Sequence, residues 1–196
     1  MSARPVLRWD ARRRGWLEGA RQVPSPNFDQ RAPGEAVELL VIHHISMPPG
    51  RFSGDAVERL FTNRLDPRAD PAFEQVAALR VSAHFLIRRR GELLQFVGCD
   101  ARAWHAGESS FMGRARCNDF SIGVELEGSG ERAFTQAQYR RLAQLAVLLR
   151  QRYPLRWVAG HSDIAPGRNF DPGPSFDWDR FEQSASAAGL ARPFTA

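Results

Sequence analysis

The sequence contains no lysine, so all 27 of its basic residues are arginines, and its formal net charge is +5. An excess of positive charge can serve binding to nucleic acid or to another anionic partner. The tightest arginine runs, 12–14 and 88–90, are too short for a polybasic tail and have no interleaved aromatic residues. We therefore predict that the arginines are solvated surface or turn residues and that nucleic acid is not a specific partner.

Cysteine is also scarce, and long apolar runs are absent. Cys99 and Cys117 are the only cysteines, and so few thiols fit a reducing compartment, in which both are expected to be free. No apolar run approaches the roughly 18 residues of a membrane-spanning helix. Charged residues and a glycine interrupt the basic segment 1–20, which therefore does not resemble a signal segment. We expect a cytoplasmic protein with no membrane partner.

The length and composition are those of one globular domain. A chain of 196 residues with 43% hydrophobic and 25% charged residues can bury most of its apolar surface in one core. It has no fixed-period repeat and no linker rich in proline or glycine. A single domain over residues 1–196 is therefore expected.

The spacing of apolar residues predicts strands alternating with helices. Two of the predicted strands, 37–42 and 157–159, are each followed closely by a histidine. The other predicted elements are a helix over 55–64, a hairpin of 81–87 with 93–97, a loop over 106–119 that is our candidate for a mobile element, a strand over 120–128, a helix that begins at Thr135 and is ended by Pro154, and a loop over 162–177.

Two histidines at strand ends are candidate metal ligands. His43 and His161 follow predicted strands, where a rigid backbone can deliver a side chain to an accessible rim. A hydrolytic zinc site needs three protein ligands and one open position, and two histidines with a carboxylate would supply the ligands. The chain has no HExxH or CxxC motif, so each histidine could equally be structural. His84 and His105 are expected to be structural or to contact a substrate.

A long irregular string near the C-terminus is far more distinctive than the ligand spacing. Residues 161–168 (HSDIAPGR) and 171–178 (DPGPSFDW) resemble the AmpD family, which comprises cytoplasmic N-acetylmuramyl-L-alanine amidases specific for 1,6-anhydro sugars. The family is related to phage amidase lysozymes and to peptidoglycan-recognition proteins. Further matches, in the family's order, are 15–17 (GWL), 23–26 (VPSP), 40–43 (LVIH), 45–50 (ISMPPG), 79–84 (LRVSAH), 103–107 (AWHAG) and 116–128 (RCNDFSIGVELEG).

The resemblance implies a fold, a metal and a reaction. The implied fold is α/β, a central mixed sheet flanked by helices, as in amidases of type 2 and peptidoglycan-recognition proteins. The implied zinc ligands are His43, His161 and Asp171, with one zinc ion per chain. The implied reaction is hydrolysis of the amide bond between the lactyl group of 1,6-anhydro-N-acetylmuramic acid and L-alanine, in peptidoglycan recycling. We expect a monomer whose partner is this small muropeptide.

The resemblance also implies a catalytic carboxylate and two substrate contacts. The carboxylate falls on Glu125, and alternation along the predicted strand turns Glu125 away from the face that carries its apolar residues. Glu127 shares that face and competes with it, and Glu125 could also be an ordinary surface carboxylate. Arg80 and Arg116 match positions that contact acidic groups of the muropeptide, for which an arginine fork is suited.

The sequence departs from the family pattern at two positions. Asn169 stands where the family usually has a lysine, whose charge would stabilise a developing oxyanion. His44 stands where the family commonly has an asparagine, so it is an alternative ligand or a sugar contact. Asn169 keeps open a second function, a module that binds muropeptides with little or no hydrolysis. An amidase that also accepts non-anhydro muropeptides stays open as well.

Overall fold

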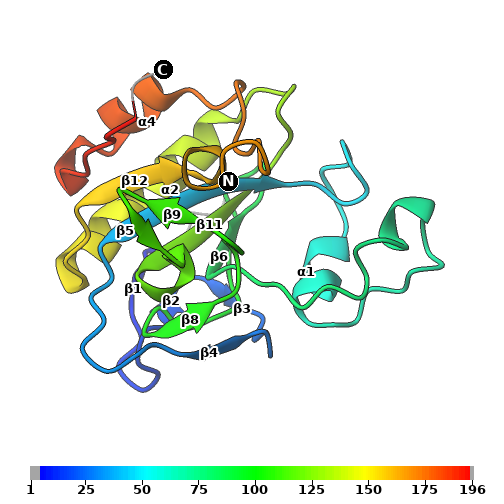
Figure 1. Ribbon diagram of the computed structural model, residues 1–196, viewed down its shortest axis with the longest axis horizontal. Helices are drawn as coiled ribbons and strands as arrows, with labels where there is room; N and C mark the ends of the chain where they lie inside the picture. The colour runs from blue at the N-terminus through cyan, green and yellow to red at the C-terminus, as the bar shows by residue number, and fades with distance from the viewer. Residues whose placement is uncertain (1–4, 195–196) are drawn as a thin grey trace.

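The computed structural model describes residues 5–194, so the first four and last two residues of the predicted domain lie outside the described residues. Its centre is a six-stranded mixed sheet in the order β12-β5-β11-β6-β7-β3 (Figure 1). The first four strands run parallel, β7 is antiparallel to β6, and β3 is parallel to β7. The strands are β3 (Arg21–Gln22), β5 (Leu39–Ile45), β6 (Phe85–Ile87), β7 (Leu93–Gln95), β11 (Ser121–Glu127) and β12 (Trp157–Gly160).

Helices and smaller two-stranded sheets surround this central sheet. Two-stranded antiparallel sheets pair β1 (Arg8–Trp9) with β2 (Leu17–Glu18), β4 (Phe28–Gln30) with β8 (Ala101–Ala103), and β9 (Ser110–Phe111) with β10 (Arg114–Ala115). The α-helices are α1 (Ala56–Phe61), α2 (Gln136–Arg152), α3 (His161–Ile164) and α4 (Trp178–Ser184), and the 3-10 helices are η1 (Pro71–Phe73), η2 (Cys117–Asp119) and η3 (Ser186–Ala188).

The largest hydrophobic core lies between the sheet and α2. From the strands, Ile122, Val124 and Leu126 enter this core, together with Leu40 and Ile42. From α2 come Tyr139, Leu142, Leu145, Ala146 and Leu149, the helical spacing that the sequence predicted. The mixed α/β fold is therefore confirmed, and the face of β11 that carries Glu125 points away from α2.

The caps of α2 explain its bounds. The Thr135 side chain accepts a hydrogen bond from the Gln138 N–H, and the Gln138 side chain accepts one from the Thr135 N–H, so both orphan donors are satisfied. Pro154 follows the C-cap Tyr153 and cannot continue the helix. The predicted helix is confirmed.

Two predicted loops contain regular structure. The segment 106–119 contains the β9–β10 hairpin, whose turn places Met112 and Gly113 at positive φ, and then η2. The segment 162–177 begins inside α3, because the carboxylate of Asp163 accepts from the Gly160 N–H and caps that helical turn. Both are local hydrogen-bonded structures without apolar periodicity, so the hydrophobic pattern did not predict them.

The opposite face of the sheet carries the segments that frame the candidate site. One smaller core gathers α1 and residues near β6 and β7, and another gathers β9, η2 and α3 around Leu39 and Val41. In Figure 1, α1 and its flanking loops extend to the right, away from α4. Cys99 and Cys117 are free and buried, as predicted. Within residues 5–194, no helix is long and apolar enough to cross a membrane.

Candidate active site

The candidate site lies at the carboxyl ends of the parallel strands. In the register of β5 with β11, His43 is directly opposite Glu125, and paired residues of neighbouring strands point to the same face of a sheet. β12 pairs with the other edge of β5 and leads into α3, which His161 begins. Three chain segments therefore bring their side chains to one edge of the sheet.

Asp171 reaches the same place because the loop after α3 folds back. The Asp171 carbonyl accepts from the Ser162 N–H at 2.8 Å, which fixes the loop beside the start of α3. Gly160 allows this approach, since a Cβ there would lie 2.7 Å from Pro172 Cδ. The predicted ligands His43, His161 and Asp171 thus come together from separate parts of the chain.

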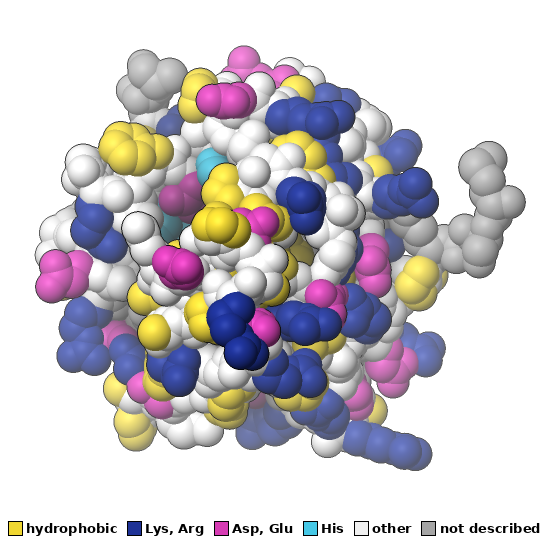
Figure 2. All heavy atoms as spheres, turned by 90° about the vertical axis from the view of Figure 1, so that its right-hand side faces the viewer, with side chains coloured by type: hydrophobic (Ala, Val, Ile, Leu, Met, Phe, Trp, Pro, Cys, Tyr) yellow, Lys and Arg dark blue, Asp and Glu magenta, His cyan; other side chains and the backbone are white. Residues whose placement is uncertain are grey.

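The three candidate ligands converge through one atom each. His43 Nδ1 lies 3.1 Å from His161 Nδ1 and 3.0 Å from Asp171 Oδ2, and His161 Nδ1 lies 3.2 Å from the same oxygen. Donors bound tetrahedrally at about 2.0–2.1 Å are about 3.3 Å apart. The spacing therefore suits a cluster that can hold a metal ion. Figure 2 shows histidine and acidic side chains recessed in a hollow of the surface.

The hydrogen bonds behind the ligands leave their converging atoms without protons. His161 Nε2 lies 3.2 Å from the Ala106 carbonyl, which can only accept, so this nitrogen is the one that donates and Nδ1 is the nitrogen free to offer a lone pair to a metal. His43 Nε2 lies 3.0 Å from His105 Nδ1 and can donate to it, which also leaves a lone pair on His43 Nδ1. Lone pairs and a carboxylate facing one another require a shared cation.

The electrostatics favour a metal ion over an extra proton as this cation. Burial lowers the pKa of His43, although Asp171 opposes the shift. Burial by itself would raise the pKa of Asp171, and only a proton or positive charge at His161 and His43 would lower it; a cation shared by the three side chains would lower it in the same way. A neutral, buried His43 beside a carboxylate is a suitable donor set for a divalent cation.

Glu125 is a buried carboxyl with an orphaned oxygen. Its residue is 9% exposed, and no described residue donates a hydrogen bond to Oε2. Burial, followed by the charge of Asp171, raises the pKa of Glu125 well above its ordinary value. Such a carboxyl within electrostatic reach of a metal-ligand cluster has the character of a catalytic acid or base.

Glu127, the competitor on the same face, is already engaged. Its Oε2 accepts from the Arg89 N–H at 3.0 Å, and its Oε1 lies 3.6 Å from Arg88 Nη1. It therefore fastens the turn between β6 and β7. The structure distinguishes the two carboxylates, since Glu125 is the one left without such a partner.

Asn169 and Arg168 occupy the loop just before Asp171. Asn169 Oδ1 is buried without a hydrogen-bond donor in the described part of the chain. Arg168 Nη2 donates to the Ala106 carbonyl at 3.2 Å and to the Glu108 carbonyl, and a Cβ on Gly107 would lie 3.2 Å from the guanidinium. Arg168 is thus held along the 106–108 backbone rather than in the position of a free cation.

The predicted substrate contacts are not members of the ligand cluster. Arg80 is exposed and donates only to the nearby backbone carbonyls of Ala78 and Leu79 among the described residues. The Arg116 side chain is 72% exposed and forms an ion pair with Asp119 at 3.1 Å. Both guanidiniums are accessible to a dissolved anionic ligand.

His44 is turned away from the ligand cluster. Successive residues of β5 point to opposite faces, so His44 does not share the face of His43. Its Nδ1 is buried without a described partner, and its Nε2 would lie 3.9 Å from a Cβ on Gly130. This position makes His44 a poor alternative to His43 as a ligand and leaves a contact to a bound molecule open to it.

The two remaining candidate residues from the sequence, His84 and His105, have different surroundings. His84 is structural, because its Nδ1 accepts from the Gly123 N–H, its Nε2 faces the Ala101 carbonyl, and burial lowers its pKa to about 3. His105 stands directly behind His43, packed so closely on Gly123 that a Cβ there would lie 2.4 Å from its ring. The placement of His105 was not predicted, since only the motif around it was distinctive.

Comparison with known proteins supports the resemblance seen in the sequence. The residue pattern of the N-acetylmuramoyl-L-alanine amidase family (Amidase_2) matches residues 33–174. The 1,6-anhydro-N-acetylmuramyl-L-alanine amidase AmpD of Escherichia coli K12 is 56% identical over 169 residues, which are 85% of this chain and 92% of that protein. The resemblance to the AmpD family is confirmed.

Solved structures agree. The crystal structure of a selenomethionine AmpD derivative superposes with a TM-score of 0.85 at 55% identity, covering 88% of this chain and 97% of that one. The E. coli amidase AmiD, solved with its substrate anhydro-N-acetylmuramic acid-L-Ala-D-gamma-Glu-L-Lys, superposes with a TM-score of 0.56 at 29% identity, covering 82% of this chain and 61% of AmiD.

Proposed function

Because the chain belongs to the AmpD family of N-acetylmuramoyl-L-alanine amidases, we propose that it hydrolyses the amide bond between the lactyl group of 1,6-anhydro-N-acetylmuramic acid and L-alanine, in peptidoglycan recycling. The observation that carries the proposal is the convergence of His43, His161 and Asp171 beside the orphaned carboxyl of Glu125. The substrate of AmiD in its solved complex contains the same kind of bond and sugar, which supports the choice of substrate.

The metal in this proposal is zinc, one ion per chain. His43, His161 and Asp171 offer two imidazole nitrogens and one carboxylate oxygen, a ligand set that zinc accepts in hydrolytic enzymes. Zinc bound there would lower the pKa of a coordinated water and polarise the scissile carbonyl. The Nδ1 lone pairs of His43 and His161 and the carboxylate of Asp171 lie close enough to bind one ion, which supports this assignment.

Glu125 supplies the proton transfer in the proposed reaction. A general base must hold a proton acceptor within hydrogen-bond reach of the attacking water, and a raised pKa brings its strength closer to that needed near neutral pH. Glu125 then takes the proton of the water and delivers it to the amine of L-alanine as the amide bond breaks. Its lack of a competing hydrogen bond leaves Oε2 available for this transfer.

Recognition of the stem peptide is assigned to two exposed arginines. Arg80 has no ion-pair partner among the described residues, and the Arg116 guanidinium is largely exposed despite its contact with Asp119. Guanidinium forks bind carboxylates through paired hydrogen bonds. We assign Arg80 and Arg116 to the acidic groups of the muropeptide, and His44 to a contact with the sugar.

A second candidate function is binding of the muropeptide with little or no hydrolysis. The observation that favours it is Asn169, which offers a neutral amide where the family usually has a lysine. Retention of all three candidate ligands and of Glu125 favours the enzyme. A cytoplasmic location, a monomeric state and a single domain over 1–196 stay predictions of this proposal.

Substitution of Asn169 by lysine tests whether the missing cation limits the rate. If it does, Asn169→Lys should raise kcat, because one oxyanion-stabilising donor is typically worth about 100- to 1,000-fold. The measurement is kcat with anhydro-muramyl-tripeptide. Asn169→Met, which adds length without charge, is the matched control. A flat or lower rate for the lysine variant would mean that Arg168 or another group already fills the role.

The experiment that tests the proposed function is direct detection of the product. The zinc-loaded protein is incubated with anhydro-muramyl-tripeptide, and free tripeptide is sought by mass spectrometry beside a chelator-treated sample. Zinc-dependent release of the peptide is expected. Intact substrate, with zinc verified at one per chain, would reject the amidase in favour of the binding module.

A further inference from the structure

Both candidate histidine ligands are backed by one short segment of chain. His43 Nε2 lies 3.0 Å from His105 Nδ1, and His161 Nε2 lies 3.2 Å from the carbonyl of Ala106. These two contacts decide which nitrogen of each ring is protonated, and therefore that Nδ1 of each ring faces Asp171. Residues 105 and 106 thus orient two ligands from separate elements, His43 on β5 and His161 at the start of α3.

This segment has no strand or helix of its own to hold it. It lies between the end of β8 at Ala103 and the start of β9 at Ser110. The backbone N–H groups of residues 105 and 106 share one acceptor, Oδ1 of Asn118, at 3.1 Å from the His105 N–H and 2.9 Å from the Ala106 N–H, while Arg168 donates to the Ala106 carbonyl. One amide oxygen therefore holds both N–H groups of the segment behind the two histidines.

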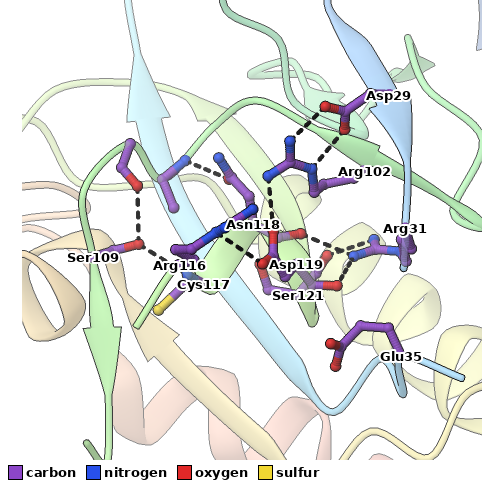
Figure 3. A network of polar contacts seen from close by, with 12 residues as sticks. Asp29, Arg31, Glu35, Arg102, Ser109, Arg116, Cys117, Asn118, Asp119 and Ser121 are labelled. Carbon is purple, nitrogen blue, oxygen red and sulfur yellow. Dashed lines mark hydrogen bonds and ion pairs between the residues drawn. The ribbon is translucent and has the colours of Figure 1, made fainter. Parts of the chain in front are cut away.

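Asn118 is itself held in place. It is 9% exposed and lies in η2, and its carbonyl accepts from Arg31 Nη1 at 2.9 Å. Arg31 also donates to the carbonyls of Asp119 and Ser121, both at 2.7 Å. Figure 3 shows Arg31 reaching this stretch from one side while the Asn118 side chain extends to the other.

The residues around Asn118 complete a rigid frame. Asp119 forms ion pairs with Arg102 at 2.8 Å and with Arg116 at 3.1 Å. Ser121 Oγ lies 3.2 Å from His105 Nε2, on the side of the ring opposite His43. The His105 ring is therefore held at both nitrogens, and its backbone is held by Asn118.

We propose that Asn118 is a positioning residue of the metal centre, acting on both histidine ligands through residues 105 and 106. The proposal rests on the zinc site of the proposed function. The hydrogen bonds of the Asn118 side chain go to residues 105 and 106 and not to the ligand atoms, so its effect is to keep His43 Nδ1 and His161 Nδ1 aimed at a common point. The partners behind metal-bound histidines typically contribute about 10- to 100-fold to metal affinity.

The test is the zinc affinity of Asn118→Ala. This variant removes the shared acceptor and leaves the Arg31 contact, which uses the backbone carbonyl of residue 118. The zinc dissociation constant, measured by competition with a chromophoric chelator, should rise by about 10- to 100-fold. The visible spectrum of the cobalt-substituted protein should change as well, because the ligand geometry loosens. Wild-type zinc affinity with an unchanged cobalt spectrum would overturn the proposal.

Further variants separate positioning from a general loss of stability. Asn118→Asp keeps an acceptor oxygen and should restore zinc affinity close to that of the wild type, whereas a loss as large as that of the alanine variant would count against the proposal. Gln95→Ala is the matched control, since the buried Gln95 amide holds the backbone of Gly15 and Leu17. Gln95→Ala should lower the thermal stability of the protein and leave its zinc affinity unchanged.

His105→Ala tests whether Asn118 acts on His43 through His105. It removes the contact to His43 and leaves the Ala106 carbonyl, so its effect on zinc should be smaller than that of Asn118→Ala, and the double variant should lose less than the sum of the two. Fully additive losses would contradict a shared route.

The outcome for the wild type separates the two proposals. If the wild type itself bound no zinc, the proposed metal would be rejected. If the wild type bound one zinc per chain and Asn118→Ala bound it with unchanged affinity, only this inference would be rejected.

Discussion

Replacing Asp171 by alanine is expected to remove zinc binding and amide hydrolysis together. Asp171 is the only carboxylate in the described His-His-Asp cluster, and its oxygen lies 3.0 Å from His43 Nδ1 and 3.2 Å from His161 Nδ1. Without it, two neutral imidazoles would have to hold a divalent ion in a buried site with no compensating charge. The zinc dissociation constant should rise by more than about 100-fold, beyond the effect of losing a partner behind a ligand.

Two measurements check this expectation: metal content after gel filtration, and release of tripeptide from anhydro-muramyl-tripeptide. Asp177→Ala is the matched control, because Asp177 lies on the same loop but serves as the N-cap of α4. Loss of this N-cap should lower the free energy of unfolding by about 1 kcal/mol and leave zinc bound. A full complement of tightly bound zinc in Asp171→Ala would remove Asp171 from the ligand set.

Replacing Glu125 by glutamine is expected to leave zinc bound and to lower kcat by about 100- to 10,000-fold, the usual contribution of a general base. The change keeps the shape of the side chain and removes its ability to take a proton. Glu127→Gln is the matched control, since Glu127 lies on the same face of β11 but holds Arg88 and Arg89. Unchanged turnover in Glu125→Gln would disprove the assignment, and loss only in Glu127→Gln would transfer it to Glu127.

Glu125→Gln should also alter the pH dependence of the free energy of unfolding of the metal-free protein. Burial raises the pKa of Glu125 in the folded state, so between the ordinary glutamate pKa and the raised one the folded protein holds a proton that the unfolded chain has lost. The contribution of Glu125 to stability therefore falls as pH rises through that window, by up to about 1.4 kcal/mol per pH unit. The buried histidines, whose pKa values are lowered, add an opposite rise in stability with pH to both proteins. Urea unfolding of the chelator-treated proteins should therefore show the Glu125 contribution as the difference in slope between the wild type and Glu125→Gln.

Local patterns were sufficient for the central elements. The helix from Thr135 to Pro154, the hairpin of β6 with β7, and the strand that carries Glu125 were predicted because a regular element repeats its apolar residues at a fixed period. The direction of Glu125 followed from the same alternation, and the sheet confirms that it faces away from α2.

Short or irregular structure was less predictable. The strands β1 to β4 are two or three residues long, which is too short for a period to be recognised. The β9–β10 hairpin depends on its turn at Met112 and Gly113 and on hydrogen bonds rather than on an apolar stripe. The predicted strand 37–42 is present in part, since β5 begins at Leu39, two residues later than predicted, and continues through His43 to Ile45 because β11 pairs with it along its full length.

The sequence by itself determined the family, the central sheet and helix, and the residue types of a possible metal site, because distinctive strings and periodic patterns are local properties of the chain. Only the tertiary structure decided that His43, His161 and Asp171 share one point, that Glu125 rather than Glu127 is left unpartnered, and that Asn118 supports the segment behind both histidines. These are relations between segments far apart in sequence, and the strand register and loop packing that create them carry no local signal.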